Sequence, residues 1–344
     1  MNRRHVALLL AVSVLAAGCT TGDRLPDAEV APAPTTTEGP ASVQCDAAEQ
    51  AAIDPVASYE PLDELPSPSE VIDNAFVQGL RTRGKLVVGI SPDTLLFGAR
   101  NLDYDATDPK GELPYEGFDI DMLVEVAIAI FGGDRTTIGE HLEFVAIPYG
   151  QRLPKLISNE VDIVAHTMTI NCRRWKQIAF SAEYFFAGQR ILVAKGSPYA
   201  TIDDLNAAAA KVCVPAGSTN ETNITEGYSR IVLSTPPDIS DCIVQLQLGT
   251  VDAISGDDTV LAGIAAQDPA TAVLGEQFSE EPYGLGINSS NTYFVQFVNR
   301  VLADMLEDGR WMESYERWLV PSLTAAGEAV TLPKPDYTRP VPGA

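Results

Sequence analysis

Residues 147–186 read IPYGQRLPKLISNEVDIVAHTMTINCRRWKQIAFSAEYFF, and this stretch decides how the rest of the chain is interpreted. Its pattern predicts a strand end, a short helix, a second strand and a polar turn. Arg152 and Arg174 stand in loops that follow predicted strands, and Thr167 and Thr169 lie between them in the sequence. A guanidinium is planar and matches both oxygens of a carboxylate. The stretch therefore predicts a pocket for a small dianion.

Length and charge limit the classes of protein that the chain can represent. Its 344 residues are enough for two domains or one large domain. A net charge of −24 and a pI near 4.3 argue against nucleic-acid binding, which needs a basic face. We interpret the acidic surface as solubilising. It does not determine the charge of the ligand, because a recessed site can be locally positive.

The N-terminus has the features of an export signal. Basic residues at 3–5 precede the apolar run 6–17, which is too short for a stable membrane-spanning helix. The ending LAAGC resembles a bacterial lipobox, although Ala16 occupies the position that is usually more apolar. The alternative is a signal peptide without lipidation. We expect a signal peptide at 1–18, lipidation at Cys19, and a protein anchored by lipid at the extracytoplasmic face of the cell membrane.

Residues 19–70 are rich in Pro, Thr, Ala, Asp and Glu and include APAPTTTEGP at 31–40. A segment of this composition cannot bury enough apolar surface to order itself, so we expect a flexible tether. Cys45 is the exception, because a disulfide there would hold its neighbours on the globular surface.

Helical and strand patterns alternate from residue 69 onwards, which indicates a parallel α/β architecture. The expected helices are 69–83, 117–131, 153–159, 202–210, 241–248, 259–266, 292–308 and 311–319. The expected strands are 85–90, 142–147, 161–165, 189–194, 211–214, 231–234, 251–255 and 282–287.

Four motifs stand in a characteristic order behind the lipobox. They are GFDIDM at 117–122, VDIVAHTMTINCRR at 161–174, FSAEYF at 180–185 and VDAISGDD at 251–258. Each motif is weak alone, but together they resemble the polar amino-acid family of extracytoplasmic solute-binding proteins, family 3. Proteins of that family feed ATP-driven (ABC) importers. The resemblance covers roughly residues 75–320.

The resemblance implies a type II periplasmic-binding-protein fold. In this fold two α/β lobes are joined by two crossing strands, and the ligand lies in the cleft between the lobes. By alignment, residues 70–187 and 284–344 form lobe one and residues 188–283 form lobe two. The hinges fall near Gly188 and Pro282. A site at the carboxyl ends of the strands agrees with α/β proteins in general.

The resemblance also assigns roles to individual residues. Arg174 matches the arginine that pairs with the α-carboxylate of the ligand, with Thr169 and Thr167 hydrogen-bonding the same group. Asp257 matches the acceptor of the α-ammonium.

Further assignments concern the second lobe and the walls of the cleft. Thr219, with Gly217 and Ser218, opens a helix whose N-terminus favours a carboxylate. Tyr149 stands near the position of an aromatic wall. Asp93 is a looser match, offset by about two residues from the usual acidic position.

Arg152 is the residue that we expect to decide specificity. Glutamine-binding relatives tend to have a small residue there, whereas several glutamate and aspartate binders have a pair similar to Gln151-Arg152. A buried arginine facing a neutral amide would lack a charge partner, at a cost on the order of 3–5 kcal/mol. We therefore expect L-glutamate or L-aspartate as ligand. The alternatives are glutamine or a broader range of polar amino acids, and a surface salt bridge for Arg152.

Four cysteines remain after Cys19 is assigned to lipid, and an even number in an exported chain suggests two disulfides. Three connectivities are open. Cys213 and Cys242 fall in one expected lobe, which favours pairing them and leaves Cys45 with Cys172. The sequence has no C-x-x-C spacing and no Cys/His cluster, so we expect no metal and no redox cofactor.

Two other functions compete with transport. An enzyme such as a dehydratase would need a general acid or base in the cleft, and the sequence shows no Ser/His/Asp set for it. We therefore expect a monomeric binding protein that is not an enzyme, has no cofactor, and delivers its ligand to ABC permease subunits. A lipoprotein that reports amino-acid levels to a membrane sensor would use the same binding chemistry, so the sequence leaves this alternative open.

Overall fold

The computed structural model describes Cys45 and residues 54–107, 111–323 and 332–343. All of these belong to one compact unit, 43–344. The signal sequence and Cys19 lie outside the described residues, so the expectations about export and lipidation stay predictions. Within the described part, no helix is both long and apolar enough to cross a membrane.

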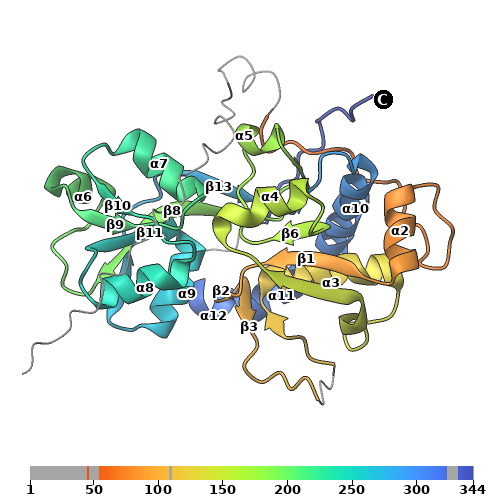
Figure 1. The fold of residues 1–344 in the computed structure, drawn as a ribbon, viewed down its shortest axis with the longest axis horizontal. Helices are drawn as coiled ribbons and strands as arrows, with labels where there is room; N and C mark the ends of the chain where they lie inside the picture. Colours follow the sequence, from red (N-terminus) through yellow and green to blue (C-terminus); the bar gives the residue numbers. More distant parts are fainter. Residues whose placement is uncertain (1–44, 46–53, 108–110, 324–331, 344) are drawn as a thin grey trace, which may run out of the picture. The chain divides into compact units, whose positions relative to one another are not determined.

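The first lobe is built on a five-stranded sheet of order β5-β1-β6-β14-β7 (Figure 1). Strand β1 pairs in parallel with β5 and β6, while β14 is antiparallel to β6 and β7. The strands are β1 (Leu86–Ile90), β5 (Leu142–Ala146), β6 (Ile163–Ala165), β7 (Ala179–Phe180) and β14 (Gly286–Ile287).

Helices cover both faces of this sheet, which explains why its central strands are apolar on both sides. Successive residues of β6 alternate, with Ile163 and Ala165 in the core under α3 and α10, and Val164 in a separate core with α4. The helices are α2 (Ala75–Arg83), α3 (Phe118–Phe131), α4 (Arg152–Ile157), α5 (Cys172–Trp175), α10 (Thr292–Asp308), α11 (Arg310–Trp318) and α12 (Val320–Leu323), with 3₁₀ turns η1 (Ile138–His141) and η2 (Tyr149–Gln151).

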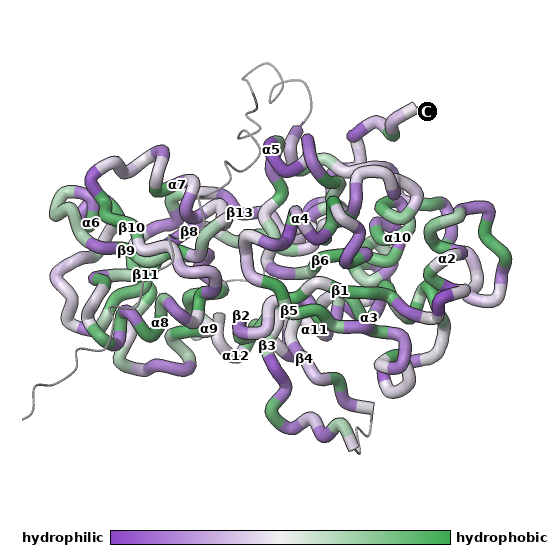
Figure 2. Tube along the Cα trace, viewed as in Figure 1, coloured by the Kyte–Doolittle hydropathy of each residue, from purple (hydrophilic) through white to green (hydrophobic). Residues whose placement is uncertain are grey.

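The second lobe contains a sheet of order β10-β9-β11-β8-β12. Its strands are β8 (Phe185–Ala194), β9 (Lys211–Cys213), β10 (Val232–Ser234), β11 (Ala253–Asp257) and β12 (Thr271–Leu274). Its helices are α6 (Ile202–Ala208), α7 (Thr219–Gly227), α8 (Ile239–Gln247) and α9 (Asp258–Gln267). In both lobes, strands are mostly hydrophobic and surface loops mostly hydrophilic, as Figure 2 shows.

Two strands cross between the lobes. Strand β8 leaves the first lobe and enters the second sheet, and β13 (Glu280–Tyr283) returns antiparallel to it. Glu280 pairs with Gly188, and Tyr283 pairs with Phe185. The predicted fold class, two α/β lobes joined by two crossing strands, is confirmed.

The predicted strand 282–287 is two strands, β13 and β14, with Gly284 between them. A Cβ on Gly284 would lie 2.7 Å from Ile170 Cγ1, so close packing explains the glycine at this break.

A small sheet between β1 and α3 was not expected from the sequence. It contains β2 (Asp93–Thr94), β3 (Gly98–Arg100) and β4 (Tyr115–Glu116), in a region where the sequence pattern predicts no strand. Its last strand leads into Gly117, which has φ +132° and whose Cβ would lie 2.2 Å from the Phe97 carbonyl oxygen. Only glycine tolerates this turn into α3.

Both disulfides have the expected pairing. Cys213 in β9 bonds to Cys242 in α8, with a Cα–Cα distance of 5.5 Å, inside the core of the second lobe. Cys45 bonds to Cys172 at the start of α5, with a Cα–Cα distance of 6.2 Å. The second bond attaches Cys45 to the first lobe.

Ordered packing begins earlier than the expected end of the tether at residue 70. Ala57, Ser58 and Tyr59 are buried, and the Ser58 hydroxyl donates to the Phe180 carbonyl oxygen at 2.9 Å. Tyr59 also forms a parallel bridge with Arg339 in the C-terminal tail. The physical reason is that Tyr59 packs in the main core of the first lobe, so the last part of the predicted tether belongs to the globular body.

Candidate functional site

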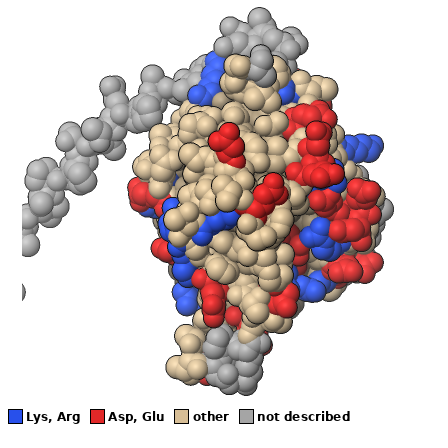
Figure 3. All heavy atoms as spheres, turned by 90° about the vertical axis from the view of Figure 1, so that its right-hand side faces the viewer, with Lys and Arg blue, Asp and Glu red and all other residues tan. Residues whose placement is uncertain are grey.

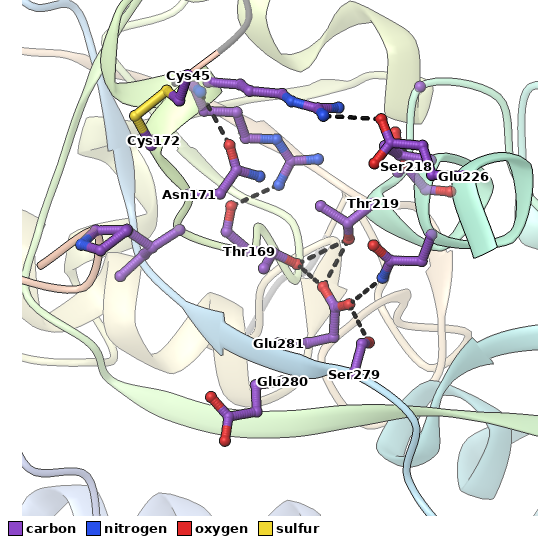
Figure 4. Close-up of a pocket in the computed structure, with 17 residues that line it drawn as sticks. Cys45, Thr169, Asn171, Cys172, Ser218, Thr219, Glu226, Ser279, Glu280 and Glu281 are labelled. Carbon is purple, nitrogen blue, oxygen red and sulfur yellow. Dashed lines mark hydrogen bonds and ion pairs between the residues drawn. A yellow bond between two sulfur atoms is a disulfide. The ribbon is translucent and has the colours of Figure 1, made fainter. Parts of the chain in front are cut away.

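A cavity of about 420 Å³ lies where the two lobes and β13 meet (Figure 4). Four of the predicted ligand-binding residues line it: Arg174, Thr169, Ser218 and Thr219. The remaining lining residues are Cys45, Pro55, Ile170, Asn171, Cys172, Arg173, Gly217, Thr222, Asn223, Glu226, Ser279, Glu280 and Glu281. The cavity therefore brings together segments about 50 and 110 residues apart in the chain, one from each lobe and one from the crossing strand β13.

Arg174 is held at the cavity by the turn that forms α5. Asn171 caps this helix, since its side chain accepts a hydrogen bond of 2.9 Å from the Arg174 backbone N–H. Arg174 is 7% exposed, and its Nη1 donates to the Thr169 carbonyl oxygen at 2.6 Å. Burial and the nearby Arg152 charge lower the pKa of Arg174 to about 9, so the side chain remains a cation at neutral pH.

The opposite wall is the N-terminus of α7. Ser218 caps α7 by accepting from the Glu221 backbone N–H at 3.1 Å, and Thr219 is the first residue of the helix. The amide groups of a first helical turn and the helix dipole favour an anion at such an end. Gly217 has φ +77°, and a Cβ there would lie 2.7 Å from Gly150 Cα in the other lobe. Glycine at 217 therefore allows the two lobes to touch.

Glu281 lies at the centre of the cavity wall, and sequence reasoning missed it. It is 1% exposed, and Oε2 accepts from the hydroxyls of Thr169 and Thr219, both at 2.6 Å. Oε1 accepts from Asn223 at 2.9 Å and from Ser279 at 2.6 Å. The available signal was an acidic pair, Glu280-Glu281, immediately before the expected strand 282–287 and the hinge expected near Pro282.

Arg152 is buried at 1% exposure and does not line the cavity. Three backbone carbonyls accept from its guanidinium: those of Tyr149 (2.9 Å), His166 (3.1 Å) and Gly217 (3.2 Å). The guanidinium carbon also lies 4.7 Å from the centre of the Tyr149 ring. Burial lowers the pKa of Arg152. This environment rules out the alternative of a surface salt bridge.

The two arginines share one electrostatic property. Neither Arg152 nor Arg174 forms an ion pair with a carboxylate of the described chain, and the two guanidinium groups donate to four backbone carbonyl oxygens. A buried charge without an opposite charge is costly, on the order of 3–5 kcal/mol. The cleft therefore holds two buried cations whose charges the described chain leaves without an ion pair.

Asp257 lies at the end of β11 and does not line the cavity. It is 5% exposed, and it accepts from Asn220 Nδ2 at 2.7 Å and from the Tyr283 hydroxyl at 2.6 Å. Burial and the neighbouring Glu281 charge raise the pKa of Asp257 to about 7. Both of its oxygens are thus already engaged by neutral donors of the protein.

Thr167 also lies outside the cavity lining. Its φ of +42° is unusual for a β-branched residue, and its backbone N–H donates to Asp119 Oδ2 at 2.8 Å. Asp119, in the first turn of α3, also accepts from the Tyr184 hydroxyl at 2.5 Å, and burial raises its pKa to about 6. The Thr167 hydroxyl is buried and has no hydrogen-bond partner in the described part of the chain. The backbone contact predicted for a ligand is therefore made by Asp119.

Tyr149 and Asp93 lie where the lobes touch and not in the cavity lining. Tyr149 packs within a cluster made mostly of second-lobe side chains, and its ring meets His166 edge to face at 4.5 Å. Asp93 Oδ2 accepts from the Ser240 backbone N–H of α8 at 3.2 Å. Burial and the Arg152 charge lower the pKa of His166 to about 3, so this histidine is neutral.

The described residues include no group of three or more His, Cys, Asp and Glu placed to hold a metal ion. Charged side chains are abundant elsewhere on the surface. Figure 3 shows acidic side chains intermixed with fewer basic ones on the end of the first lobe that carries α2 and α10.

Two α/β lobes joined by two crossing strands, with buried charged groups where the lobes meet, define a ligand-binding protein of the type II periplasmic-binding-protein class. Residues 98–321 match the model of the bacterial extracellular solute-binding proteins, family 3, and the chain belongs to this family.

Several known proteins are similar to the chain. A glutamine-binding protein of an ABC transporter from Bacillus subtilis (strain 168) is 31% identical over 70% of this chain and 83% of its own length. A glutamate-binding protein from Corynebacterium efficiens is 28% identical over 72% of this chain and 81% of its own. The solved structure of an ancestral arginine-binding protein bound to glutamine has a TM-score of 0.60 and 31% identity, covering 69% of this chain and 98% of that one.

Proposed function

We propose that the chain binds an acidic L-amino acid, glutamate or aspartate, between its lobes and delivers it to an ABC importer. The observation that carries this proposal is the pair of buried arginines, Arg152 and Arg174, without an ion pair in the described chain. A ligand with two carboxylates would compensate both charges, whereas a neutral side chain would compensate one. The glutamine-binding and glutamate-binding relatives support an amino acid as the class of ligand.

The proposed contacts follow from the geometry of the cleft. Arg174 and the N-terminus of α7, at Thr219, lie on opposite walls of the cavity and suit the α-carboxylate. Arg152 lies outside the cavity lining, with three hydrogen bonds to backbone carbonyls, so its proposed role is that its positive charge favours a second carboxylate in the cleft.

A second candidate ligand is glutamine. It is favoured by the 31% identity to the glutamine-binding relative and by the three carbonyl acceptors around Arg152, which already stabilise that cation in part. An amide could accept one hydrogen bond from Arg152 without adding a second negative charge to the cleft.

Isothermal titration calorimetry of the purified protein tests the proposal and separates these ligands. Titrations with L-glutamate, L-aspartate, L-glutamine, L-arginine and L-cystine should give tight binding to one or both acidic amino acids and weaker binding to glutamine. Binding to arginine or cystine alone would contradict the proposal.

We also propose that Cys19 carries the lipid that anchors the protein at the extracytoplasmic face of the membrane. The sequence LAAGC supports this proposal. Replacing Cys19 with alanine should release the protein from the membrane fraction of the expressing cell. A mature wild-type protein that begins well after Cys19 and has no acyl mass would contradict it.

A further inference from the structure

Helix α5 carries Arg174 to the cavity, but it has only four residues, Cys172–Trp175. A single helical turn is unstable in isolation, because ordering its residues costs more free energy than its first hydrogen bond returns. The position of Arg174 therefore depends on the contacts that hold the two ends of this turn.

The start of α5 is held by a covalent bond. Cys172, its first residue, forms the disulfide with Cys45, which is 127 residues away in the sequence. Both cysteines line the cavity, and Figure 4 shows the disulfide among the other lining residues. The start of α5 is therefore tied to the N-terminal part of the chain.

The end of α5 is held through Trp175. The indole N–H of Trp175 donates to the carbonyl oxygen of Pro55 at 2.8 Å, and Pro55 itself lines the cavity. The ring of Tyr59 meets the indole edge to face, with ring centres 5.7 Å apart. The N-terminal segment 54–59 thus packs on the residue that follows Arg174.

Arg339, in the C-terminal tail, ties Trp175 and this segment together. Its guanidinium carbon lies 3.8 Å from the centre of the Trp175 ring. Its Nε donates to the carbonyl oxygen of Ala57 at 2.7 Å, and its Nη2 to that of Asp54 at 3.2 Å. The backbone N–H of Arg339 also donates to the carbonyl oxygen of Ser58 at 3.1 Å. A planar guanidinium stacks on an aromatic ring and donates within its own plane at the same time.

We infer that Arg339 is a positioning residue for ligand binding. It fixes Trp175 and the segment 54–59, and it thereby holds the neighbouring Arg174 at the cavity. The inference rests on the proposed function, because that proposal gives Arg174 the α-carboxylate of the ligand. Both Arg339 and the segment 54–59 lie outside residues 98–321, the range that matches the family model.

Arg81 provides a matched control. Its guanidinium also donates to three backbone carbonyl oxygens, those of Ile130 (2.9 Å), Glu70 (2.6 Å) and Pro66 (3.2 Å). The lining of the cavity, as the structure describes it, includes none of these residues. Arg81→Ala therefore removes the same kind of contact from the first lobe at a place away from α5.

Isothermal titration calorimetry with L-glutamate and L-glutamine compares Arg339→Ala, Arg339→Lys and Arg81→Ala with the wild type. Arg339→Ala should weaken binding of both ligands by roughly 3-fold to 30-fold, the range for a residue that acts on a site without touching the ligand. Both affinities should fall by the same factor, because both ligands have the α-carboxylate that Arg174 is proposed to bind. Arg339→Lys keeps a cation at the indole and should lose less affinity. Arg81→Ala should bind within about twofold of the wild type.

Amide hydrogen exchange of the ligand-free protein tests the same contacts without any ligand. The backbone N–H of Trp175 donates to the carbonyl oxygen of Asn171 at 3.0 Å, so its exchange reports the opening of α5. Exchange at this amide should be at least about threefold faster in Arg339→Ala. In Arg81→Ala it should equal that of the wild type.

Three results would overturn the inference. They are unchanged exchange in α5 of Arg339→Ala, an unchanged L-glutamate affinity in that variant, and an equal loss of affinity in Arg81→Ala. A loss for L-glutamate alone, with L-glutamine unaffected, would also contradict an action through Arg174. If Arg339→Ala does not fold, Trp175→Phe decides, since it keeps an aromatic ring and removes the donor to Pro55. This variant must show faster exchange in α5 and weaker binding of both ligands.

Failure of the proposed ligand is distinguishable from failure of this inference. A wild-type protein that binds neither glutamate nor aspartate contradicts the proposed specificity, and the titrations are then made with the amino acid that it does bind. Hydrogen exchange in α5 of Arg339→Ala still decides whether the C-terminal tail holds this helix.

Discussion

Arg152 Nη2 donates a hydrogen bond of 3.2 Å to the carbonyl oxygen of Gly217, so a side chain of the first lobe holds a backbone group of the second. Gly217 immediately precedes Ser218, the cap of α7, and its backbone packs closely on Gly150. Arg152, which we expect to select the ligand, therefore also positions the N-terminus of α7, which faces the cavity. Specificity and contact between the lobes depend on the same guanidinium.

Replacing Arg152 with alanine is expected to weaken L-glutamate binding by at least about 30-fold, because a charge partner in a buried site is lost. L-glutamine should be affected less, so the ratio of the two affinities should fall. Calorimetry with both ligands measures the ratio. An unchanged ratio would show that Arg152 acts only through the loop at Gly217.

Asp119 supports the strained turn at Thr167. Replacing it with alanine leaves the Tyr184 hydroxyl and the Thr167 N–H buried without their present acceptor. The free energy of unfolding should fall by at least about 2 kcal/mol. Tyr184→Phe removes only the hydroxyl donor and keeps its acceptor, Asp119, so the free energy of unfolding should fall by less. Urea unfolding of both variants tests this order, and the reverse order would contradict the role given to Asp119.

Asp257 makes stability depend on pH. In the folded protein burial raises its pKa from 3.8 to about 7, so the folded chain holds the proton more tightly than the unfolded chain. This stabilising contribution is fully present below about pH 4 and is lost as pH rises through about 7. Between pH 5 and 8, the melting temperature of ligand-free Asp257→Asn should decline less than that of the wild type. Parallel curves for the two proteins would contradict this assignment.

The Cys213–Cys242 disulfide crosslinks two buried residues of the second lobe. Replacing both cysteines with alanine should lower the free energy of unfolding by about 2–4 kcal/mol, mainly through the unfolded chain. Chemical denaturation measures the difference. A loss below about 0.5 kcal/mol would mean that the bond contributes little beyond the packing already present.

Much of the fold could be predicted because the hydrophobic period reports local structure directly. Helix α10, Thr292–Asp308, has the bounds that the pattern predicts, and β1 and α3 differ by one residue at their starts. The short strands β2 to β4 were missed, since two or three residues carry no period. Contacts between the lobes could not be predicted for a different reason: they depend on how segments that are distant in the sequence meet in space.

In the candidate site, too, residues with a local sequence signal could be predicted and a residue placed by distant contacts could not. Arg174 and Thr169 follow a strand end, and Thr219 opens a helix, so local pattern and family resemblance identify all three, and the structure places them around one cavity. No local sequence pattern identifies Glu281 as a site residue. Its position follows from the course of β13 between the lobes, where hydroxyls of both lobes reach one carboxylate.

The central claim is that an amino acid is held by the unpaired charge of Arg174. The most direct measurement is the affinity of L-glutamate for Arg174→Ala, with Arg230→Ala, an exposed arginine outside the cavity, as control. We predict tight binding by the wild type and by Arg230→Ala, and a loss of at least about 100-fold in Arg174→Ala, with the fold retained. Equal affinities in all three proteins would contradict the account.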